Sequence, residues 1–227
     1  MTPYYQDNWV TIFNADCRGI LPLLDPVELL LTDPPYGIGF AGQPTKWQRL
    51  AGNQPKDWDD KPVSRQILID YIHIAGKSII WGGNYFQLPI SRCWLSWCKP
   101  DAPPSMGNVE VAWTNLEGNS KYIVHSISAT NKERVSHPTQ KPLRVIRWAL
   151  NCADVGERAI ICDPFMGSGT TLVAAKQLGR RAIGIEISKE YCDIAIERLR
   201  QDVLDFSEPL PEAQPVTGSL FDAGEVA

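Results

Sequence analysis

Histidine is scarce in this sequence, and its cysteines show none of the spacings that hold metal ions. The 227 residues include 3 His and 6 Cys, and no two cysteines form a C-x-x-C pair or stand in a paired Cys/His pattern. A structural zinc site needs four Cys or His ligands at short, regular spacings. We therefore expect no metal site, and we interpret most of the thiols as reduced core residues.

Long apolar runs are also missing. No segment approaches the roughly 20 consecutive apolar residues that a transmembrane helix needs, and residues 1–7 lack the basic and apolar regions of a signal peptide. These absences predict a soluble, cytoplasmic protein without membrane contact. With 44% hydrophobic residues, the chain is long enough to build one sizeable globular domain.

Basic residues are absent from the end of the chain. Residues 201–227 contain six acidic residues and no Lys or Arg, so residues 1–200 carry a formal charge of +2 although the whole chain carries −4. This distribution argues against a generally basic nucleic-acid binder. Local groups of Lys and Arg within the body can still contact phosphates, and ordinary solvated charge is the alternative. The segment 207–227, rich in Pro, Glu and Ala, predicts a flexible acidic tail.

Apolar runs alternate with helical patterns along the rest of the sequence. The expected strands are 9–14, 27–33, 77–81, 158–163 and 181–186, with β-like segments at 92–97 and 109–114. The expected helices are 18–24, 62–75, one beginning near 142, 170–178 and 188–204. Residues 115–136 are polar and receive no assignment. Alternating strands and helices predict an α/β fold with a mostly parallel sheet and helices on both faces.

A carboxylate, two prolines and an aromatic ring follow the second expected strand as Asp33-Pro34-Pro35-Tyr36. Proline fixes φ and lacks an N–H, so the chain leaves the sheet as a stiff, extended corner. The corner holds the Asp33 carboxylate, the Pro34 carbonyl and the Tyr36 ring in a fixed relation. Such a set is suited to gripping an exocyclic amino group and stacking on the ring that carries it. The alternative is a proline turn with a solvated aspartate.

A glycine-rich turn, DPFMGSGTT at 163–171, lies between an expected strand and an expected helix. Its glycines leave room for a ligand at the backbone, and the helix N-terminus is electropositive. The lysine of a phosphate-binding loop is missing, and position 172 is Leu instead of the third glycine of a dinucleotide fingerprint. The next strand ends in Glu186, which is suited to ribose hydroxyls. A cationic nucleoside such as S-adenosylmethionine fits this acidic setting; a purely structural turn is the alternative.

Taken together, these segments resemble the β-group amino-methyltransferases of DNA, which modify adenine N6 or cytosine N4. The resemblance covers about residues 9–204 and rests on DPPY at 33–36, HPTQKP at 137–142, DPFMGSGTT at 163–171 and the strand ending in Glu186. The tetrapeptide precedes the glycine-rich turn, which is the permuted motif order of this group. Shorter similarities at 14–17 and 81–86 look like the phage and prophage branch. The resemblance implies a Rossmann-like, S-adenosylmethionine-dependent methyltransferase.

The resemblance also implies roles for individual residues. Asp33, Pro34, Pro35 and Tyr36 would form the catalytic corner, where Asp33 and the Pro34 carbonyl accept the amino hydrogens and Tyr36 stacks on a flipped base. The cofactor would be bound by Asp16, His137, Thr139, Lys141, Asp163, Phe165, Gly167, Gly169, Thr170 and Glu186. Among these, Lys141 would meet the methionine carboxylate, Asp163 would lie near the methionine amino group, and Glu186 would hold the ribose.

Basic and aromatic residues occur together in the stretch 37–61, which is a candidate DNA-binding loop. An exposed tryptophan beside basic residues can wedge into or stack on DNA, whereas packing of the loop on its own domain is the alternative. The candidate DNA-contacting residues are Lys46, Trp47, Arg49, Lys56, Trp58, Lys132 and Arg134.

One methyltransferase domain is expected over 1–206, with a catalytic half at 9–114, a small target-recognition insert at 115–136 and a cofactor half at 137–204. The expected partner is DNA, bound by a monomer or a homodimer. Ser219-Leu220-Phe221 is similar to peptides that dock on bacterial sliding clamps, and an unstructured tail is the alternative.

Aspartate at position 33 favours adenine N6 as the methyl acceptor. Cytosine N4 is the alternative within the enzyme class, and an inactive cofactor- and DNA-binding regulatory protein is the alternative outside it. No Pro-Cys dipeptide occurs, which disfavours covalent attack by a cysteine on cytosine.

Overall fold

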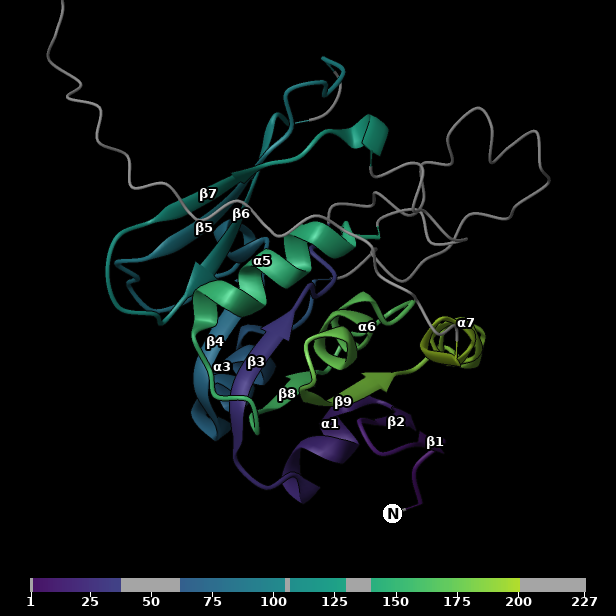
Figure 1. The fold of residues 1–227 in the computed structure, drawn as a ribbon. Coiled ribbons are helices and arrows are strands. Elements are labelled where there is room, and N and C mark those ends of the chain that lie inside the picture. The colour runs from purple at the N-terminus through teal and green to yellow at the C-terminus, as the bar shows by residue number, and fades with distance from the viewer. Residues whose placement is uncertain (1, 38–61, 105–106, 130–139, 201–227) are drawn as a thin grey trace, which may run out of the picture.

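A computed structural model describes residues 2–37, 62–104, 107–129 and 140–200. Nine strands in this part of the chain form one sheet, in the order β1-β2-β9-β8-β3-β4-β6-β5-β7 (Figure 1). The strands are β1 Tyr5–Gln6, β2 Val10–Asn14, β3 Val27–Thr32, β4 Ala75–Trp81, β5 Trp94–Cys98, β6 Val109–Thr114, β7 Lys121–Val124, β8 Ile160–Asp163 and β9 Arg181–Glu186. The α-helices are α1 Cys17–Ile20, α3 Arg65–Ile74, α5 Leu143–Ala153, α6 Thr170–Gln177 and α7 Lys189–Arg200, with short 3-10 turns η1 Leu21–Leu23 and η2 Gly83–Tyr85.

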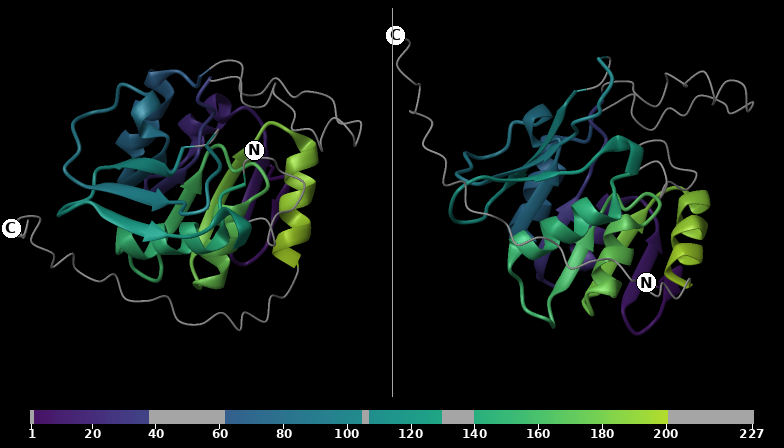
Figure 2. Two further views of the ribbon diagram at one scale, coloured as in Figure 1. Left: turned by 90° about the horizontal axis from the view of Figure 1, so that it is seen from above. Right: turned by 45° about the horizontal axis from the view of Figure 1, so that its top comes forward.

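The centre of the sheet is parallel. The strands β2, β9, β8, β3 and β4 all run the same way, while β1 joins β2 antiparallel and β6 lies antiparallel between β4 and β5. Strand β7 is parallel to β5 and extends the sheet on the side away from α7 (Figure 2). Because parallel strands end at the same edge, the segments that follow β3, β8 and β9 meet there. The predicted mostly parallel α/β fold is confirmed.

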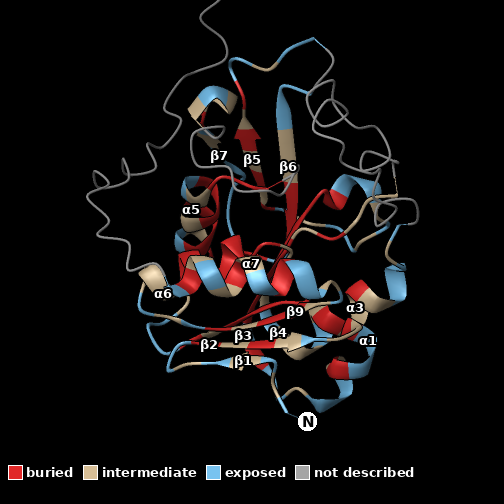
Figure 3. Ribbon diagram, turned by 90° about the vertical axis from the view of Figure 1, so that its right-hand side faces the viewer, coloured by how far each residue is buried: buried red, intermediate tan, exposed pale blue. Residues whose placement is uncertain are grey.

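Helices cover the two faces of the sheet, as the sequence predicted. In β3, Leu29 and Leu31 face the core that α5, α6 and α7 cover. Leu30 faces the opposite core, which α1 and α3 cover. All three leucines are fully buried, and Figure 3 shows the buried residues concentrated along the central strands. A strand buried on both faces reads as a continuous apolar run, which explains the sequence VELLLT.

Most predicted elements are present, with shifted ends. The helix expected from residue 62 begins at Arg65, because the Ser64 side chain accepts a hydrogen bond from the Ile67 amide and caps the helix there. Strand β7 lies in the stretch that received no assignment, and the two-residue β1 was not predicted. Within the described residues, all six cysteines are free thiols and four are buried. No helix in the described ranges is both long and apolar enough to cross a bilayer.

Candidate active site

The Asp33–Tyr36 corner projects from the carboxyl end of β3, where the two prolines prevent the strand from continuing. Asp33 and Tyr36 are half-buried, and the Tyr36 hydroxyl donates a hydrogen bond to Asp33 Oδ1. Burial raises the pKa of this hydroxyl well above its usual value, so it stays protonated and acts as the donor. The Pro35 carbonyl accepts a 3.2 Å hydrogen bond from the Val63 amide, which ties the corner to the start of α3. The corner is thus rigid and presents one carboxylate and one ring.

The Tyr36 ring packs against the segment that follows β4. Gly82 has φ +65° and its backbone lies so close to Tyr36 that any Cβ there would overlap the ring. The Tyr85 ring stacks on Tyr36 at a centroid distance of 4.9 Å and an interplanar angle of 17°, and Phe86 meets it edge-on at 6.2 Å. Tyr85 is 52% exposed. The segment 81–86 resembles the phage branch in sequence, but its position against Tyr36 was not predicted.

Lys141 lies at the Asp33–Tyr36 corner. Its ammonium nitrogen is 2.6 Å from Asp33 Oδ2 and 3.1 Å from Glu110 Oε2 on β6, and it also reaches the Tyr36 hydroxyl at 3.4 Å. Burial alone would lower the pKa of Lys141, but the charges of Asp33 and Glu110 raise it well above its usual value. The resemblance assigned Lys141 to the methionine carboxylate, whereas the structure shows its ammonium against two protein carboxylates. Glu110 was not a candidate in the sequence.

Asp163, at the end of β8, is a buried carboxylate. Its Oδ1 accepts hydrogen bonds from the Thr32 hydroxyl at 2.7 Å and from the Phe165 amide at 3.1 Å. These donors are neutral, and burial raises the pKa of Asp163 to about 6. Thr32 immediately precedes Asp33, so this hydrogen bond joins the strand ends that carry the two predicted half-sites.

Glu186 ends β9 on the other side of β8. Its Oε2 accepts from the Gly167 amide at 3.1 Å and its Oε1 from the Ser188 amide at 2.8 Å. Burial raises the pKa of the Glu186 carboxyl above its usual value. Two acidic side chains, Asp163 and Glu186, therefore flank the glycine-rich turn in surroundings that favour a cationic ligand group.

The glycine-rich turn leads directly into α6. Gly167 and Gly169 have φ +49° and +78°, and a Cβ on Gly169 would lie 2.7 Å from the Ala195 Cβ of α7, so the turn requires glycine there. Phe165 is half-buried. The Thr170 hydroxyl is buried and accepts a 3.1 Å hydrogen bond from Arg198. Thr170 therefore has a structural partner in addition to any ligand contact.

Asp16 lies beyond the carboxyl end of β2, which is the neighbour of β9. The preceding Ala15 amide donates to the Glu186 carbonyl at 3.1 Å, so Asp16 and Glu186 lie at the same edge of the sheet. The Asp16 carboxylate caps α1 and pairs with Arg18. It is half-buried and remains a candidate for the wall of a ligand site.

Several predicted site residues fall outside the described ranges. They are His137 and Thr139 among the cofactor candidates, all seven DNA-contact candidates (Lys46, Trp47, Arg49, Lys56, Trp58, Lys132 and Arg134), and the Ser219–Phe221 peptide.

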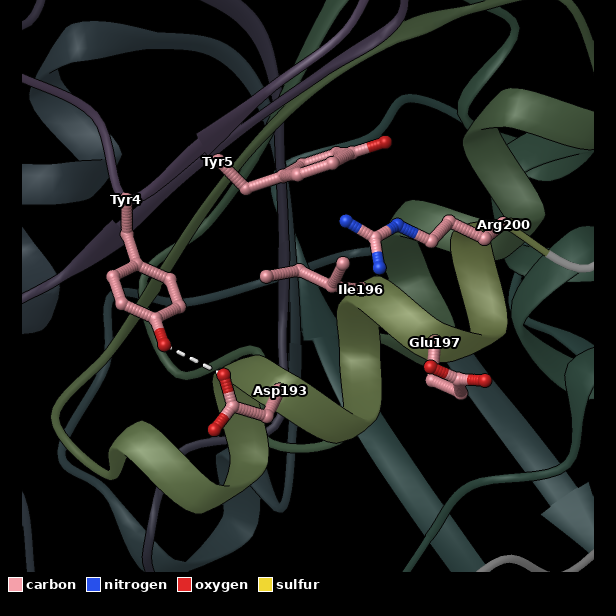
Figure 4. Close-up of a pocket in the computed structure, with 6 residues that line it drawn as sticks. All are labelled: Tyr4, Tyr5, Asp193, Ile196, Glu197 and Arg200. Atoms are coloured by element: carbon pink, nitrogen blue, oxygen red, sulfur yellow. Dashed lines mark hydrogen bonds between the residues drawn. The ribbon is translucent and has the colours of Figure 1, made fainter.

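A separate hollow of about 440 Å³ lies between the start of the chain and α7 (Figure 4). Tyr4 donates a 2.6 Å hydrogen bond to Asp193, and both residues line the hollow. The residues that line it are Tyr4, Tyr5, Asp193, Ile196, Glu197 and Arg200. None of the predicted catalytic or cofactor residues lines it, so it is distinct from the candidate active site.

Known proteins similar in sequence to this chain are DNA methylases. Residues 80–197 match the N6/N4 methyltransferase family of DNA methylases. The type II methyltransferase M2.DpnII of Streptococcus pneumoniae is 52% identical, over 88% of this chain and 93% of that protein. The chain belongs to the N6/N4 DNA methylase family. It is therefore a DNA methyltransferase of the class that modifies exocyclic amino groups.

Solved structures show the same fold. The methylase superimposes on the M1.HpyAVI–SAM complex with a TM-score of 0.59 at 23% identity, over 84% of this chain and 99% of that one. It superimposes on the PvuII DNA methyltransferase, which is cytosine-N4-specific, with a TM-score of 0.60 at 18% identity, over 89% and 90% of the two chains. At these identities the likeness supports the fold alone and leaves the target base open.

Proposed function

We propose that this methylase transfers a methyl group from S-adenosylmethionine to the N6 of adenine in DNA. The observation that carries the proposal is the contact between the two strand ends. The Thr32 hydroxyl, next to Asp33, donates to Asp163 beside the glycine-rich turn at 2.7 Å. In this proposal, the acceptor for the target amino group and the acidic residue for a cationic cofactor follow two adjacent strands, β3 and β8.

The residues around the turn fit S-adenosylmethionine. Asp163 is buried, meets neutral donors within the described residues, and has a raised pKa, so a cationic group would find an anion that lacks a counter-charge. Glu186 offers a carboxylate to ribose hydroxyls, and the positive-φ glycines allow close approach to the backbone. When bound, this cofactor supplies an electrophilic methyl group on a sulfonium ion. We also propose that the protein is a β-group enzyme, in which the catalytic tetrapeptide precedes the glycine-rich turn in the chain.

The catalytic corner acts on the amino group of the target base. An aromatic amino nitrogen is a poor nucleophile because its lone pair is delocalised into the ring. Asp33 Oδ1 and the Pro34 carbonyl accept the two amino hydrogens, which favours the pyramidal geometry in which the lone pair can attack. In the free protein the Tyr36 hydroxyl occupies Oδ1, so the amino group replaces that hydrogen bond. The base leaves the helical stack and gains stacking on Tyr36.

The base that is modified can be identified directly. Unmethylated plasmid DNA is incubated with the full-length protein and S-adenosylmethionine, then digested to nucleosides and analysed by mass spectrometry. We expect N6-methyldeoxyadenosine as the product. Detection of N4-methyldeoxycytidine would instead show that cytosine N4 is the methyl acceptor. DNA binding without either product would instead support the inactive regulatory alternative.

Gly82 provides a test of the Tyr36 platform. Replacing Gly82 with alanine should lower kcat/KM for DNA by about 100-fold, because the new Cβ displaces the ring and small misplacements at a reacting centre have effects of this size. Gly118→Ala is the matched control, since Gly118 also has a positive φ (+95°) but has open space around its missing Cβ. Equal activities of the two variants would show that the Gly82–Tyr36 contact is unimportant for catalysis.

A further inference from the structure

Four charged side chains form a continuous chain that ends at Asp33. Lys141 Nζ lies 2.6 Å from Asp33 Oδ2 and 3.1 Å from Glu110 Oε2, and Lys99 forms an ion pair with the other oxygen of Glu110. The charges alternate in sign along this chain. Lys99 directly follows β5 and Glu110 lies on the paired strand β6, whereas Asp33 and Lys141 come from the corner after β3 and the segment before α5, which only tertiary structure brings to this pair.

The two lysines are held in place by burial as well as by charge. Lys141 is 8% exposed and Lys99 is 5% exposed. A buried ammonium is strongly destabilising unless it is paired, so each lysine must stay on its carboxylates. Each ammonium also lies near an aromatic ring: Lys141 Nζ is 5.6 Å from the centre of the Trp81 ring, and Lys99 Nζ is 4.8 Å from that of Trp97. The four charged side chains therefore form a partly buried, ordered network rather than a set of surface ion pairs.

We infer that Lys141, held by Glu110 and Lys99 behind it, is a positioning residue for Asp33 in methyl transfer. This inference rests on the proposed function. Lys141 holds Oδ2, which leaves Oδ1 as the oxygen for the target amino hydrogen. Because the carboxylate cannot rotate away from the ammonium, Oδ1 keeps one direction when the Tyr36 hydroxyl is displaced.

Glu110 has its own part in this arrangement. Burial alone would raise the pKa of Glu110, but Lys141 and Lys99 lower it, so Glu110 is ionised at neutral pH. Its charge gives the Lys141 ammonium a second carboxylate beside Asp33 and keeps it from moving to another anion. The most direct competitor is the methionine carboxylate of the cofactor, the partner that the family resemblance gives to Lys141. The two roles predict different kinetic defects.

The test uses full-length Lys141→Met and Glu110→Gln variants, with Lys189→Met and Glu157→Gln as controls at exposed positions outside the candidate site. For each protein, the Kd for S-adenosylmethionine is measured by calorimetry without DNA, and kcat is measured at saturating cofactor and DNA. We expect Lys141→Met to lower kcat about 100-fold and Glu110→Gln about 10-fold, with Kd within about threefold of the original protein. Lys141→Arg should restore part of kcat, because it returns the charge.

Three results would overturn the inference. If Lys141→Met weakens cofactor binding and leaves the saturated kcat unchanged, the lysine acts on the cofactor. If Glu110→Gln, which preserves side-chain shape, keeps the original kcat, the chain of charges does not position Asp33. If both variants lower only the melting temperature, the chain is structural. Methyl transfer by the unmodified protein is measured alongside: its absence would overturn the proposed function as well, whereas normal transfer with unaffected variants would overturn this inference alone.

Discussion

Replacing Asp33 with alanine should reduce methyl transfer by roughly 1,000-fold while leaving S-adenosylmethionine binding within a few-fold of normal. The reduction follows from removing the acceptor aimed at the reacting nitrogen, and single preorganised hydrogen-bonding groups in active sites have effects of about 100- to 1,000-fold. The variant also removes one of the two carboxylates that hold the buried Lys141. The expected loss is therefore at the upper end of that range.

The measurement combines methyl incorporation into DNA with calorimetric titration of the cofactor. Asp25→Ala is the control, because Asp25 is exposed and precedes β3, whereas the corner follows the other end of that strand. The rate of methyl transfer by Asp33→Asn should lie between those of Asp33→Ala and Asp25→Ala. The amide keeps one acceptor oxygen but loses the charge that pairs with Lys141. A normal kcat for Asp33→Ala would remove Asp33 from the mechanism.

Replacing Asp163 with asparagine should have opposite effects on stability and on cofactor binding. The amide oxygen can still accept from the Thr32 hydroxyl and the Phe165 amide, so the fold is retained. Loss of the anion should weaken S-adenosylmethionine binding by about 10- to 100-fold, the value of one charge-assisted hydrogen bond. The same change removes a buried charge, so the variant should melt at a higher temperature than the original protein at pH 8.

The pH dependence of this difference has a defined sign. Folding raises the pKa of Asp163 from 3.8 to about 6, so the folded state binds the proton more tightly than the unfolded state does. The stability that this carboxyl contributes is fully present below about pH 4 and is lost as the pH rises through about 6. The loss amounts to about 3 kcal/mol, at 1.36 kcal/mol per pKa unit.

Melting curves of the original protein and of Asp163→Asn are recorded between pH 4 and 8 without cofactor. The difference in stability between the two proteins at each pH isolates Asp163, because the other carboxylates contribute equally to both. The gap should widen in favour of Asp163→Asn between about pH 4 and 6 and stay constant above. A gap that does not change with pH would show that Asp163 ionises as an ordinary carboxyl. Unchanged cofactor affinity would remove Asp163 from the cofactor site.

The sequence predicted the parts of the site that depend on short segments. A doubly buried strand followed by Asp33-Pro34-Pro35-Tyr36 fixes the corner locally, and two glycines with positive φ fix the turn before α6. Both carry signals within a few neighbouring residues. The same holds for Glu186, which ends an apolar strand at the predicted position.

What the sequence did not predict depends on contacts between distant segments. Lys141 and Asp33 are 108 positions apart, and no local pattern indicates that they form an ion pair. Glu110 reads as an ordinary polar residue in a strand, and Tyr85 as one more aromatic in an apolar region. Their roles follow from the order of strands, which places β6 beside β4 and turns Glu110 toward the corner.

The pairing of β2 with β9 has a consequence for the synthesis of this protein. The first long strand of the chain finds its neighbour 172 positions later, where Asn14 meets the Glu186 carbonyl. Contacts across such long stretches of chain form slowly, and a nascent chain lacks this partner strand until residues 181–186 have been made. A ribosome-bound fragment that ends before β9 already contains β3 and β4, but it lacks Glu186 and the strand that carries it. The residues proposed to bind the cofactor therefore come together only after β9 has been synthesised.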